Sequence, residues 1–328
     1  MPAYSNDPQK LQEFALDAAR QYGLDSDVNV SLLNLSENAT FKIEADGAQS
    51  ILRIHRPSYH TPAAIESELT WVEALRASDL VSTPAILKAP NGDRVVTATD
   101  STGEQRNAVM FEFMQGSEPT DDRLVDDFVQ LGSITARLHQ HAKQWVKPSG
   151  FTRFTWDLDT ALGPNGHWGY WRTDGLAIGP SELKVLDPLV ETITRRLMAF
   201  GNGPDRFGLV HADMRLANLL VDGPRVSVID FDDCGLSWFM YDLGSSVSFI
   251  EDSPLIPAMV DSWVEGYRKV AELSKAEVDE LQTFIMFRRL LLVSWVGTHQ
   301  DTETGQEMGT NFTKVTCDLA EKYLSNYA

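Results

Sequence analysis

Hydrophobic positions in the first third of the chain follow first a helical and then a strand period. Apolar residues recur at helical spacing after Asp7-Pro8, a favourable helix start, and Gly23 can end this helix. Three short apolar runs follow, at residues 28–35, 41–44 and 51–55. The last two are joined through Asp46-Gly47, a turn sequence. The pattern therefore predicts one helix and three antiparallel strands.

The pattern continues to alternate between helix and strand as far as residue 145. A helix is predicted from Thr61-Pro62 to about residue 77. The runs 85–88 and 94–99 flank Asn91-Gly92, which predicts a hairpin. Further predicted elements are a strand at 107–114, a break at 115–119 and a long amphipathic helix at 121–145.

The second half of the chain is predicted to be mainly helical, with short strands in its middle. Residues 151–178 are rich in aromatic residues and glycine and show no helical period. Helices are predicted over 180–200 and from 254 onward. Three short apolar runs are predicted strands, at 207–210, 219–221 and 226–229. We expect these strands to share a sheet that presents the polar residues beside them to one cleft.

Polar residues follow these short strands at a particular spacing. His211-Ala212-Asp213 follows the first strand, Asn218 precedes the second and Asp230 ends the third. Phosphoryl transfer from ATP needs a carboxylate beside the attacking hydroxyl and hard oxygen ligands for magnesium. Asp and Asn are also common in turns, which would explain any one of these residues. Three at this spacing, each bordered by apolar strands, favour a phosphotransfer site.

The stretch from 211 to 243 resembles the aminoglycoside phosphotransferase and choline kinase-like superfamily, which has a protein-kinase-like fold. That superfamily has the pattern H-G-D-x-x-x-x-N, then I-D-[FWL]-[DEG]-D-A-x-x-G and a downstream D-L. This chain has H-A-D-M-R-L-A-N at 211–218, I-D-F-D-D-C-G at 229–235 and Asp242-Leu243. Ala212 stands where the pattern has Gly.

The resemblance implies a role for each residue of this motif. Asp213 would be the catalytic base. His211 and Asp242 would brace the catalytic loop around it. Asn218 and Asp230 would bind the magnesium ion that accompanies ATP.

A cation and a carboxylate near the N-terminus are candidates for nucleotide binding. The strand I-L-R-I-H-R-P at 51–57 resembles the superfamily's V-L-[KR]-x-x-R-P strand, whose cation holds the α- and β-phosphates. Arg53 takes that position and can bind phosphate oxygens in a bidentate manner. Its two neighbours in the strand should face away from it. The superfamily pairs this cation with a Glu of the next helix, and Glu68 fits that pattern better than Glu66.

Two further segments are candidates for nucleotide contacts. The loop at 36–40 lies where protein kinases have a Gly-rich loop, but it contains no glycine and resembles the superfamily's Ser/Glu/Asn-type loop. Its amides and the side chains of Ser36 and Asn38 could bind phosphate oxygens, although a plain hairpin turn would also explain it. Backbone groups from Glu112 to Met114 could meet the adenine edge.

Composition narrows the possible partners. The chain has 328 residues, with 28 Lys and Arg against 47 Asp and Glu, and a formal net charge of −19. Such a surface repels phosphate backbones and argues against a nucleic acid partner. Cys234 and Cys317 provide no disulfide framework, and no apolar run approaches the roughly 20 residues that span a bilayer. The N-terminus is polar, so we expect a cytoplasmic protein without membrane contact.

The phosphate acceptor is expected to be a small hydroxyl compound that carries an amine. The negative net charge would concentrate cations near the protein. Asp232 is a third candidate magnesium ligand, and either Asp232 or Asp233 could instead face the acceptor or be solvated. Four aromatic rings could hold an ammonium group by cation–π attraction, although a place in the core is the commoner role for each. These rings are Trp168, Tyr170, Trp171 and Trp238.

Together these features predict an α+β protein with a bilobed, protein-kinase-like fold. Residues 1–114 would form the nucleotide-binding lobe, and 115–328 a helical lobe with the catalytic loop, metal ligands and acceptor site. The expected activity is transfer of the ATP γ-phosphoryl group to a small amine-bearing molecule, with magnesium. The sequences L-R-I-H-R-P at 52–57 and H-W-G-Y-W-R at 167–172 resemble the stress-response kinase and type II homoserine kinase-like branch of the superfamily. A Ser/Thr protein kinase of the stress-response type and a non-catalytic pseudokinase are the alternatives, and the sequence indicates no oligomeric state.

Overall fold

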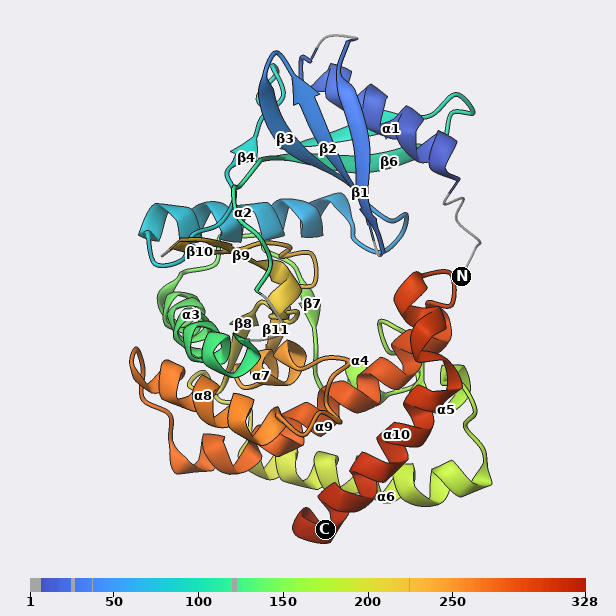
Figure 1. The fold of residues 1–328 in the computed structure, drawn as a ribbon, viewed down its shortest axis with the longest axis vertical. Coiled ribbons are helices and arrows are strands. Elements are labelled where there is room, and N and C mark those ends of the chain that lie inside the picture. Colours follow the sequence, from blue (N-terminus) through green and yellow to red (C-terminus); the bar gives the residue numbers. More distant parts are fainter. Residues whose placement is uncertain (1–6, 25–26, 37, 120–122, 224) are drawn as a thin grey trace. The chain divides into compact units, whose positions relative to one another are not determined.

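The chain forms two compact units. The structure is a computed structural model that describes residues 7–24, 27–36, 38–119, 123–223 and 225–328. The first unit contains Met1–Ser117, Lys147–Arg153 and Leu220–Asp232, and the second contains Glu118–Val146, Phe154–Leu219 and Asp233–Ala328. Strands dominate the first unit and helices the second, so the predicted α+β class is confirmed (Figure 1). The assignment of nucleotide binding to residues 1–114 stays a prediction.

The first unit contains a six-stranded antiparallel sheet. Its strands are β1 (Asn29–Leu35), β2 (Ala39–Ala45), β3 (Ala48–Ile54), β4 (Ile86–Leu87), β5 (Val95–Thr99) and β6 (Gln105–Glu112). Strands β1, β2, β3 and β6 are neighbours in that order, and β4 and β5 both pair with the other edge of β6. The three strands predicted near the N-terminus are therefore confirmed.

The hairpin predicted around Asn91-Gly92 is wrong. The chain does turn there, with the Gly92 amide donating to the Ala89 carbonyl at 2.8 Å. Among the described strands, however, β4 and β5 each pair with β6 and not with each other. Strand β4 pairs with residues 110–111 and β5 with residues 105–109, so they follow one another along one edge. A turn sequence indicates where the chain bends, but it does not determine whether the strands before and after the bend pair with each other.

Each face of this sheet is covered by one helix. Helix α1 (Pro8–Gln21) covers the face that carries Leu52 and Ile54 of β3. Helix α2 (Pro62–Ser78) covers the other face through Ile65 and Leu69. Successive side chains of a strand point to opposite faces. Arg53 therefore faces α2, and its two neighbours face away from it, as predicted.

Two later segments of the chain complete the first unit. One is residues 147–153. The other is the two-stranded sheet of β9 (Leu219–Asp222) and β10 (Arg225–Val228). The sequence Asp222-Gly223-Pro224 between these strands predicts a turn, and Pro224 lies outside the described residues. Single bridges connect Ser227 to Ser82 and Val221 to Ser117. The residues that follow β10 are thereby attached to the first unit.

The second unit consists of helices around a three-stranded sheet. Strand β11 (Gly235–Trp238) lies between β7 (Phe154–Thr155) and β8 (Phe207–Val210). The helices are α3 (Leu124–Gln144), α4 (Leu158–Leu162), α5 (Trp171–Asp174), α6 (Pro180–Phe200), α7 (Tyr241–Ser246), α8 (Ile256–Arg268), α9 (Lys275–Thr298) and α10 (Glu303–Tyr327). The helices predicted over 180–200 and after 254 are confirmed, whereas the predicted start of α3 at Asp121 lies outside the described residues. Among the described residues, no helix has the length and apolar character that crossing a membrane requires.

The expectation that the three short strands after residue 206 share one sheet is wrong. Strand β8 pairs with β11, which the sequence pattern did not predict, whereas β9 pairs with β10. The polar residues after β8 and after β10 are therefore carried by different sheets and different units. Short strands have little preference of their own for a partner, so distant residues decide the pairing.

Helices α3 and α8 approach each other backbone to backbone through two glycines. A Cβ atom on Gly132 would lie 2.1 Å from the Trp263 carbonyl oxygen, and one on Gly266 would lie 1.8 Å from the Val129 carbonyl oxygen. Neither position has room for a methyl group. The close approach matters for the site because α3 also carries His139, which contacts Asp242, a residue that binds two backbone amides at 211–212.

An overpacking cost at the upper end of the usual range of about 1–3 kcal/mol is expected, because the added Cβ would meet backbone atoms. After the roughly 1 kcal/mol that Ala gains over Gly in a helix is subtracted, we expect Gly266→Ala to destabilise the protein by about 1–2 kcal/mol. Urea unfolding followed by circular dichroism measures the change. Glu265→Ala, at the neighbouring exposed position of α8, should change stability by less than about 0.5 kcal/mol. An equally stable Gly266→Ala protein would contradict the close approach.

Candidate active site

The predicted ion pair between strand and helix is present in the first unit. Arg53 Nη2 donates to Glu68 Oε1 at 2.6 Å, and both side chains are buried. Glu66 instead accepts from Arg94 Nε at 2.9 Å. The choice between the two glutamates is therefore decided in favour of Glu68. Its role in holding nucleotide phosphates stays a prediction.

Glu68 reaches Arg53 because of how α2 begins. The side chain of Thr61 accepts from the Ala64 amide at 3.2 Å, and Pro62 occupies the first turn. This capped start directs Glu68 inward, beside the apolar residues that pack on the sheet. Burial raises the pKa of Glu68. Burial would lower the pKa of Arg53, but the carboxylates of Glu68 and its neighbours outweigh that effect and raise it, so Arg53 remains a cation.

The segment after β10 places its two predicted metal ligands in different surroundings. The Asp230 side chain is 49% exposed, and its Oδ1 atom accepts from Arg53 Nη1 at 3.5 Å. The Asp232 side chain is only 6% exposed, and its Oδ2 atom accepts from Asn38 Nδ2 at 2.7 Å. Asp230 has a φ of 58°, a backbone conformation that is uncommon for residues other than Gly. Of these two aspartates, Asp230 thus presents its carboxylate to solvent, whereas Asp232 is buried among donors of this chain. The expected metal role of each stays a prediction.

Asp232 is the centre of a buried polar cluster, which we call the Asp232 cluster. It comprises Asp232 and the side chains of Asn38, Arg53, His55, His60 and Arg153. The Asp232 carbonyl accepts from His60 Nε2 at 2.8 Å and from Arg153 Nη2. Burial would raise the pKa of Asp232, but Arg53 and the other basic groups outweigh it and hold the pKa far below its usual range. Burial lowers the pKa of His60 to about 4 and lowers that of His55 well below its ordinary value.

The remaining predicted nucleotide contacts also lie in the first unit. Ser36 is exposed, whereas Asn38 is buried, with Oδ1 accepting from the Arg56 amide at 3.0 Å. The Glu112 amide donates to the Ala85 carbonyl at 2.8 Å and is thus engaged within the unit. Met114 is half-buried just after β6. The expected contacts of Ser36, Asn38, Glu112 and Met114 with a nucleotide stay predictions.

The predicted catalytic loop lies in the second unit, directly after β8. Asn218 Nδ2 donates to Asp213 Oδ2 and to the Asp213 carbonyl, both at 2.8 Å. The fully buried His211 accepts from the Asp213 amide through Nδ1 at 3.3 Å. These bonds bring Asp213, Asn218 and His211 together. The other group of predicted residues lies in the first unit and comprises Arg53, Glu68, Asp230 and Asp232.

Asp242 braces the catalytic loop, as expected. Its Oδ1 atom accepts from the Ala212 amide at 2.7 Å, and its Oδ2 atom accepts from the His211 amide at 3.3 Å. His139 Nε2 of α3 lies 2.9 Å from Asp242 Oδ2 and holds the brace in turn. Ala212 has a φ of 67°. The superfamily pattern has Gly at this position because Gly adopts a positive φ without strain.

Arg288 of α9 is a site residue that the sequence analysis missed. Its Nη2 donates to Asp213 Oδ1 at 3.1 Å and its Nη1 donates to the Tyr241 hydroxyl at 2.9 Å. Burial would raise the pKa of Asp213, but Arg215 and Arg288 outweigh it and lower the pKa. Asp213 is thus kept ionised and oriented. The sequence does contain an indication of this role. Two adjacent arginines, Arg288 and Arg289, interrupt an apolar stretch of the helix, and charged residues in such a stretch are usually buried only when they are paired with acidic residues.

The aromatic rings proposed for the acceptor ammonium group are mostly core residues. Trp168, Trp171 and Trp238 are 2%, 2% and 4% exposed. The Arg288 guanidinium already lies over the Trp168 ring, 4.9 Å from its centroid. Tyr170 is half-buried. The expectation that the three tryptophans hold an acceptor is therefore corrected, because their surfaces are used in packing.

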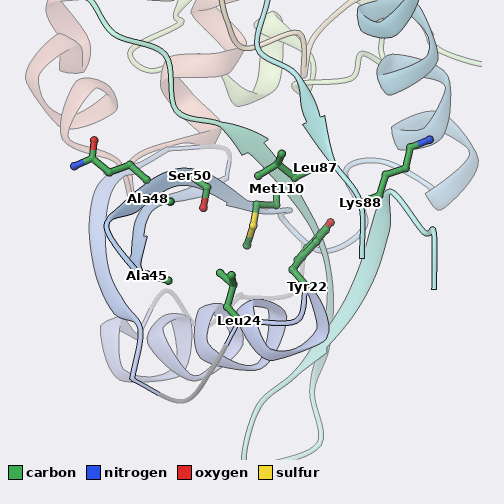
Figure 2. Close-up of a pocket in the computed structure, with 9 residues that line it drawn as sticks. Tyr22, Leu24, Ala45, Ala48, Ser50, Leu87, Lys88 and Met110 are labelled. Atoms are coloured by element: carbon green, nitrogen blue, oxygen red, sulfur yellow. The ribbon is translucent and has the colours of Figure 1, made fainter. Parts of the chain in front are cut away.

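A cavity of about 300 Å³ lies elsewhere in the first unit. Figure 2 shows Leu24 at the end of α1, Leu87 and Met110 around it, with the Ser50 hydroxyl among them. Met110 belongs to the core under α1, on the sheet face opposite Arg53. The sheet separates this cavity from the Arg53–Glu68 pair, so it is not part of the predicted nucleotide site.

The strained backbone at Ala212 leads to a first prediction for this site. A left-handed conformation costs a non-glycine residue about 1–2 kcal/mol, whereas Gly loses roughly 0.5–1 kcal/mol more entropy on folding. We expect Ala212→Gly to leave the free energy of unfolding unchanged or to raise it by up to about 1.5 kcal/mol. Ala136→Gly, in the middle of α3, should lower it by at least about 1 kcal/mol. Equal losses in both variants, measured by urea unfolding, would show that Ala212 is unstrained.

The buried His60 leads to a second prediction, on the pH dependence of stability. Its pKa is about 4 when folded and near 6.5 when unfolded, so only the unfolded chain binds the proton between these values. The stabilisation from neutral His60 is complete above pH 6.5 and is lost as the pH falls towards 4. Glutamine does not titrate, so His60→Gln lacks this pH-dependent contribution. When the pH is lowered from 7.5 to 4, the free energy of unfolding of His60→Gln, relative to that of the wild type, should therefore rise by about 3 kcal/mol.

Unfolding titrations at several pH values measure this difference for His60→Gln. Lys88→Gln, at an exposed position, is the control because a lysine does not titrate in this range. Its stability should run parallel to that of the wild type. Parallel curves for His60→Gln as well would mean that His60 titrates normally in the folded protein.

Comparison with known proteins agrees with this arrangement. The structure of a microcompartment-associated aminopropanol kinase is 44% identical in sequence, with a TM-score of 0.88, over 95% of this chain and 97% of that chain. Amicoumacin kinase of Bacillus subtilis (strain 168) is 23% identical over 308 residues, 90% of this chain and 88% of the relative. The amicoumacin kinase hAmiN, in complex with AMP-PNP, Ca²⁺ and Ami, shares the fold with a TM-score of 0.75 at 23% identity, over 95% of this chain and 93% of that chain.

A family-level match covers most of the chain. Residues 31–273 match the phosphotransferase enzyme family, a range that includes every residue of the predicted nucleotide, metal and catalytic groups. The resemblance inferred from the motif at 211–243 is thereby confirmed at the level of the superfamily, while the finer branch assignment stays a prediction. Together with the kinase-like fold, this match shows that the chain belongs to the phosphotransferase enzyme family.

Proposed function

We propose that this protein transfers the γ-phosphoryl group of ATP to the hydroxyl of a small amino alcohol. The observation that carries the proposal is the ionised carboxylate of Asp213, held between donors from Asn218 and Arg288. A fixed carboxylate of this kind can accept the hydroxyl proton and orient the attacking oxygen. Family membership supports the same reaction class.

Two residues offer oxygen atoms that fit a magnesium ion. Asp230 offers a half-exposed carboxylate, and Asn218 uses its amide nitrogen for Asp213, which leaves its amide oxygen for a metal ion. Hard oxygen atoms of this kind are the ligands that magnesium prefers. When bound, magnesium would neutralise charge on the transferred phosphoryl group.

The remaining roles follow from the residues of the chain. Arg53 would hold phosphate oxygens, and Glu68 keeps its guanidinium directed. Arg288 orients Asp213 by a bond to one carboxylate oxygen, while Asn218 binds the other. Both oxygens are thus partly engaged, which favours an orienting role for Asp213 alongside proton acceptance. The cytoplasmic location expected from the sequence is part of the same proposal.

The choice of an amino alcohol rests on similarity and on charge. The 44% identity to an aminopropanol kinase, over nearly the whole of both chains, supports an acceptor of that class. The net charge of −19 favours a cationic acceptor over an anionic one. A Ser/Thr protein kinase and a pseudokinase are the alternatives that the experiment below separates from it.

We expect ADP release with Mg-ATP to be stimulated by 1-amino-2-propanol and ethanolamine, and far less by 1,2-propanediol, which lacks the amine. Asp213→Asn should lower kcat by about 10²–10⁴-fold with little change in ATP affinity, because a positioned base acts on the chemical step. Asp205→Asn, at an exposed position of the same unit, is the control and should retain full activity.

The assay couples ADP release to a spectrophotometric readout, with calorimetry for ATP binding. Stimulation by a generic protein substrate alone would identify a protein kinase. ATP binding without turnover on any acceptor would identify a pseudokinase. Full activity of Asp213→Asn would remove Asp213 from the catalytic role.

A further inference from the structure

The Asp232 cluster joins segments that lie far apart in the sequence. Asn38 lies before β2, His60 before α2, and Arg153 in the short segment that follows α3 and belongs to the first unit. All three donate to Asp232: Asn38 to the carboxylate, and His60 and Arg153 to the main-chain carbonyl. The sequence motifs predict none of these three contacts with Asp232.

Arg153 connects this segment to helix α2. Its Nη1 donates to the Ala64 carbonyl at 3.0 Å, while its Nη2 donates to the Asp232 carbonyl. The amide of Thr152 donates to Ser67 Oγ at 3.0 Å, also on α2. The Arg153 side chain is buried. Two parallel attachments therefore hold residues 152–153 against the first two turns of the helix that carries Glu68.

The two residues that follow Asp230 are anchored in the first unit, while the Asp230 carboxylate itself remains half exposed to solvent. Phe231 is buried and meets the Trp71 ring of α2 edge-on, with centroids 5.4 Å apart. Asp232 is fixed through both its carboxylate and its carbonyl. The positive φ of Asp230 is a strained conformation that persists only where the surroundings impose it. Phe231 and Asp232 supply that constraint.

The surroundings of Asp232 also disfavour a metal ion. Its Oδ1 atom lies 3.8 Å from Arg53 Nη1 and 3.5 Å from His55 Nδ1, and it is fully buried without a hydrogen bond. Arg53 Nη1 also lies 3.5 Å from Asp230 Oδ1, so this cation does not distinguish the two aspartates. Burial does distinguish them, because an ion would have to enter the interior to reach Asp232 and would compete with the Asn38 bond on its Oδ2 atom. The partners of Asp232 thus match an anchor and not a ligand.

We propose that Arg153 is a positioning residue for the metal ligand Asp230, acting through the carbonyl of Asp232, and that Asp232 is an anchor and not a magnesium ligand. The proposal rests on the proposed use of Mg-ATP. Arg153 makes the presentation of Asp230 depend on the same helix that orients Arg53 through Glu68. Residue 154, next in the chain, begins β7 of the second unit.

The test measures ATP binding by calorimetry, with magnesium and with EDTA, on the full chain without acceptor. Arg153→Gln should weaken binding of Mg-ATP at least about tenfold and change binding of metal-free ATP less than about twofold. Arg153→Lys should fall between it and the wild type, because one ammonium group cannot replace a fork that reaches two carbonyls. Arg94→Gln, which removes bonds to Glu66 and Glu73 on α2, is the matched control and should not alter the magnesium effect.

A double-mutant cycle decides whether Arg153 acts through Asp230. In an Asp230→Asn background, Arg153→Gln should cause no further loss of Mg-ATP affinity, because the ligand that it positions is absent. Hydrogen exchange of residues 229–233 should be faster in Arg153→Gln than in the wild type, and unchanged in Arg94→Gln.

Failure of this inference is separable from failure of the proposed function. A wild type that binds no ATP overturns the function. A wild type with magnesium-dependent binding, combined with equal losses for Arg153→Gln with and without magnesium, overturns the positioning role alone. Additive losses in the cycle do the same. If Arg153→Gln does not fold, the same criteria apply to Arg153→Lys.

Discussion

The buried charge of Arg53 is the constraint on which the first unit depends. A guanidinium removed from water must be balanced by carboxylates whose remaining atoms are also satisfied. Glu68 and Asp232 meet it from α2 and from the segment after β10. Asp232 in turn requires Asn38, His60 and Arg153. One strand cation thus determines how a sheet, a helix and two later segments of the chain are joined.

The second unit follows the same rule with two adjacent cations of α9. Arg288 binds Asp213 in the catalytic loop, whereas Arg289 binds Glu251 at 2.6 Å and lies over the Phe312 ring. Burial raises the pKa of Glu251, although Arg289 opposes this shift. Each arginine binds a carboxylate in a different segment of the second unit. Helix α9, which carries both arginines, therefore supports both segments. Removing either partner of such a pair would leave an uncompensated charge in the interior.

Two of the residues with a positive φ lie where chemistry is expected, although Asp46, Ser58, Asp79, Ala177 and Phe249 also have a positive φ and lie elsewhere. Ala212 precedes Asp213 with a φ of 67°, and the metal-ligand candidate Asp230 has a φ of 58°. The Ala212 amide donates to the buried carboxylate of Asp242, and the amide of the buried Asp232 donates to Asp230 Oδ1 at 3.4 Å. Strained conformations persist only where surrounding contacts over-determine them. In each unit a buried aspartate, Asp242 or Asp232, thus braces the segment that carries a residue for which we propose chemistry.

Local features of this chain could be predicted from its sequence, because neighbouring residues encode them. Helix periods and caps located α1, α2 and α6, and the spacing of Asp213, Asn218 and Asp230 indicated the family. Other features depended on residues distant in the chain. The pairing of β4 and β5 with β6, and of β8 with β11, was decided by long-range contacts that periodicity does not encode. Asp230 and Asp232 look equivalent in sequence, and only the tertiary structure separates them, because burial and the donors around a carboxylate determine whether it can meet a metal ion.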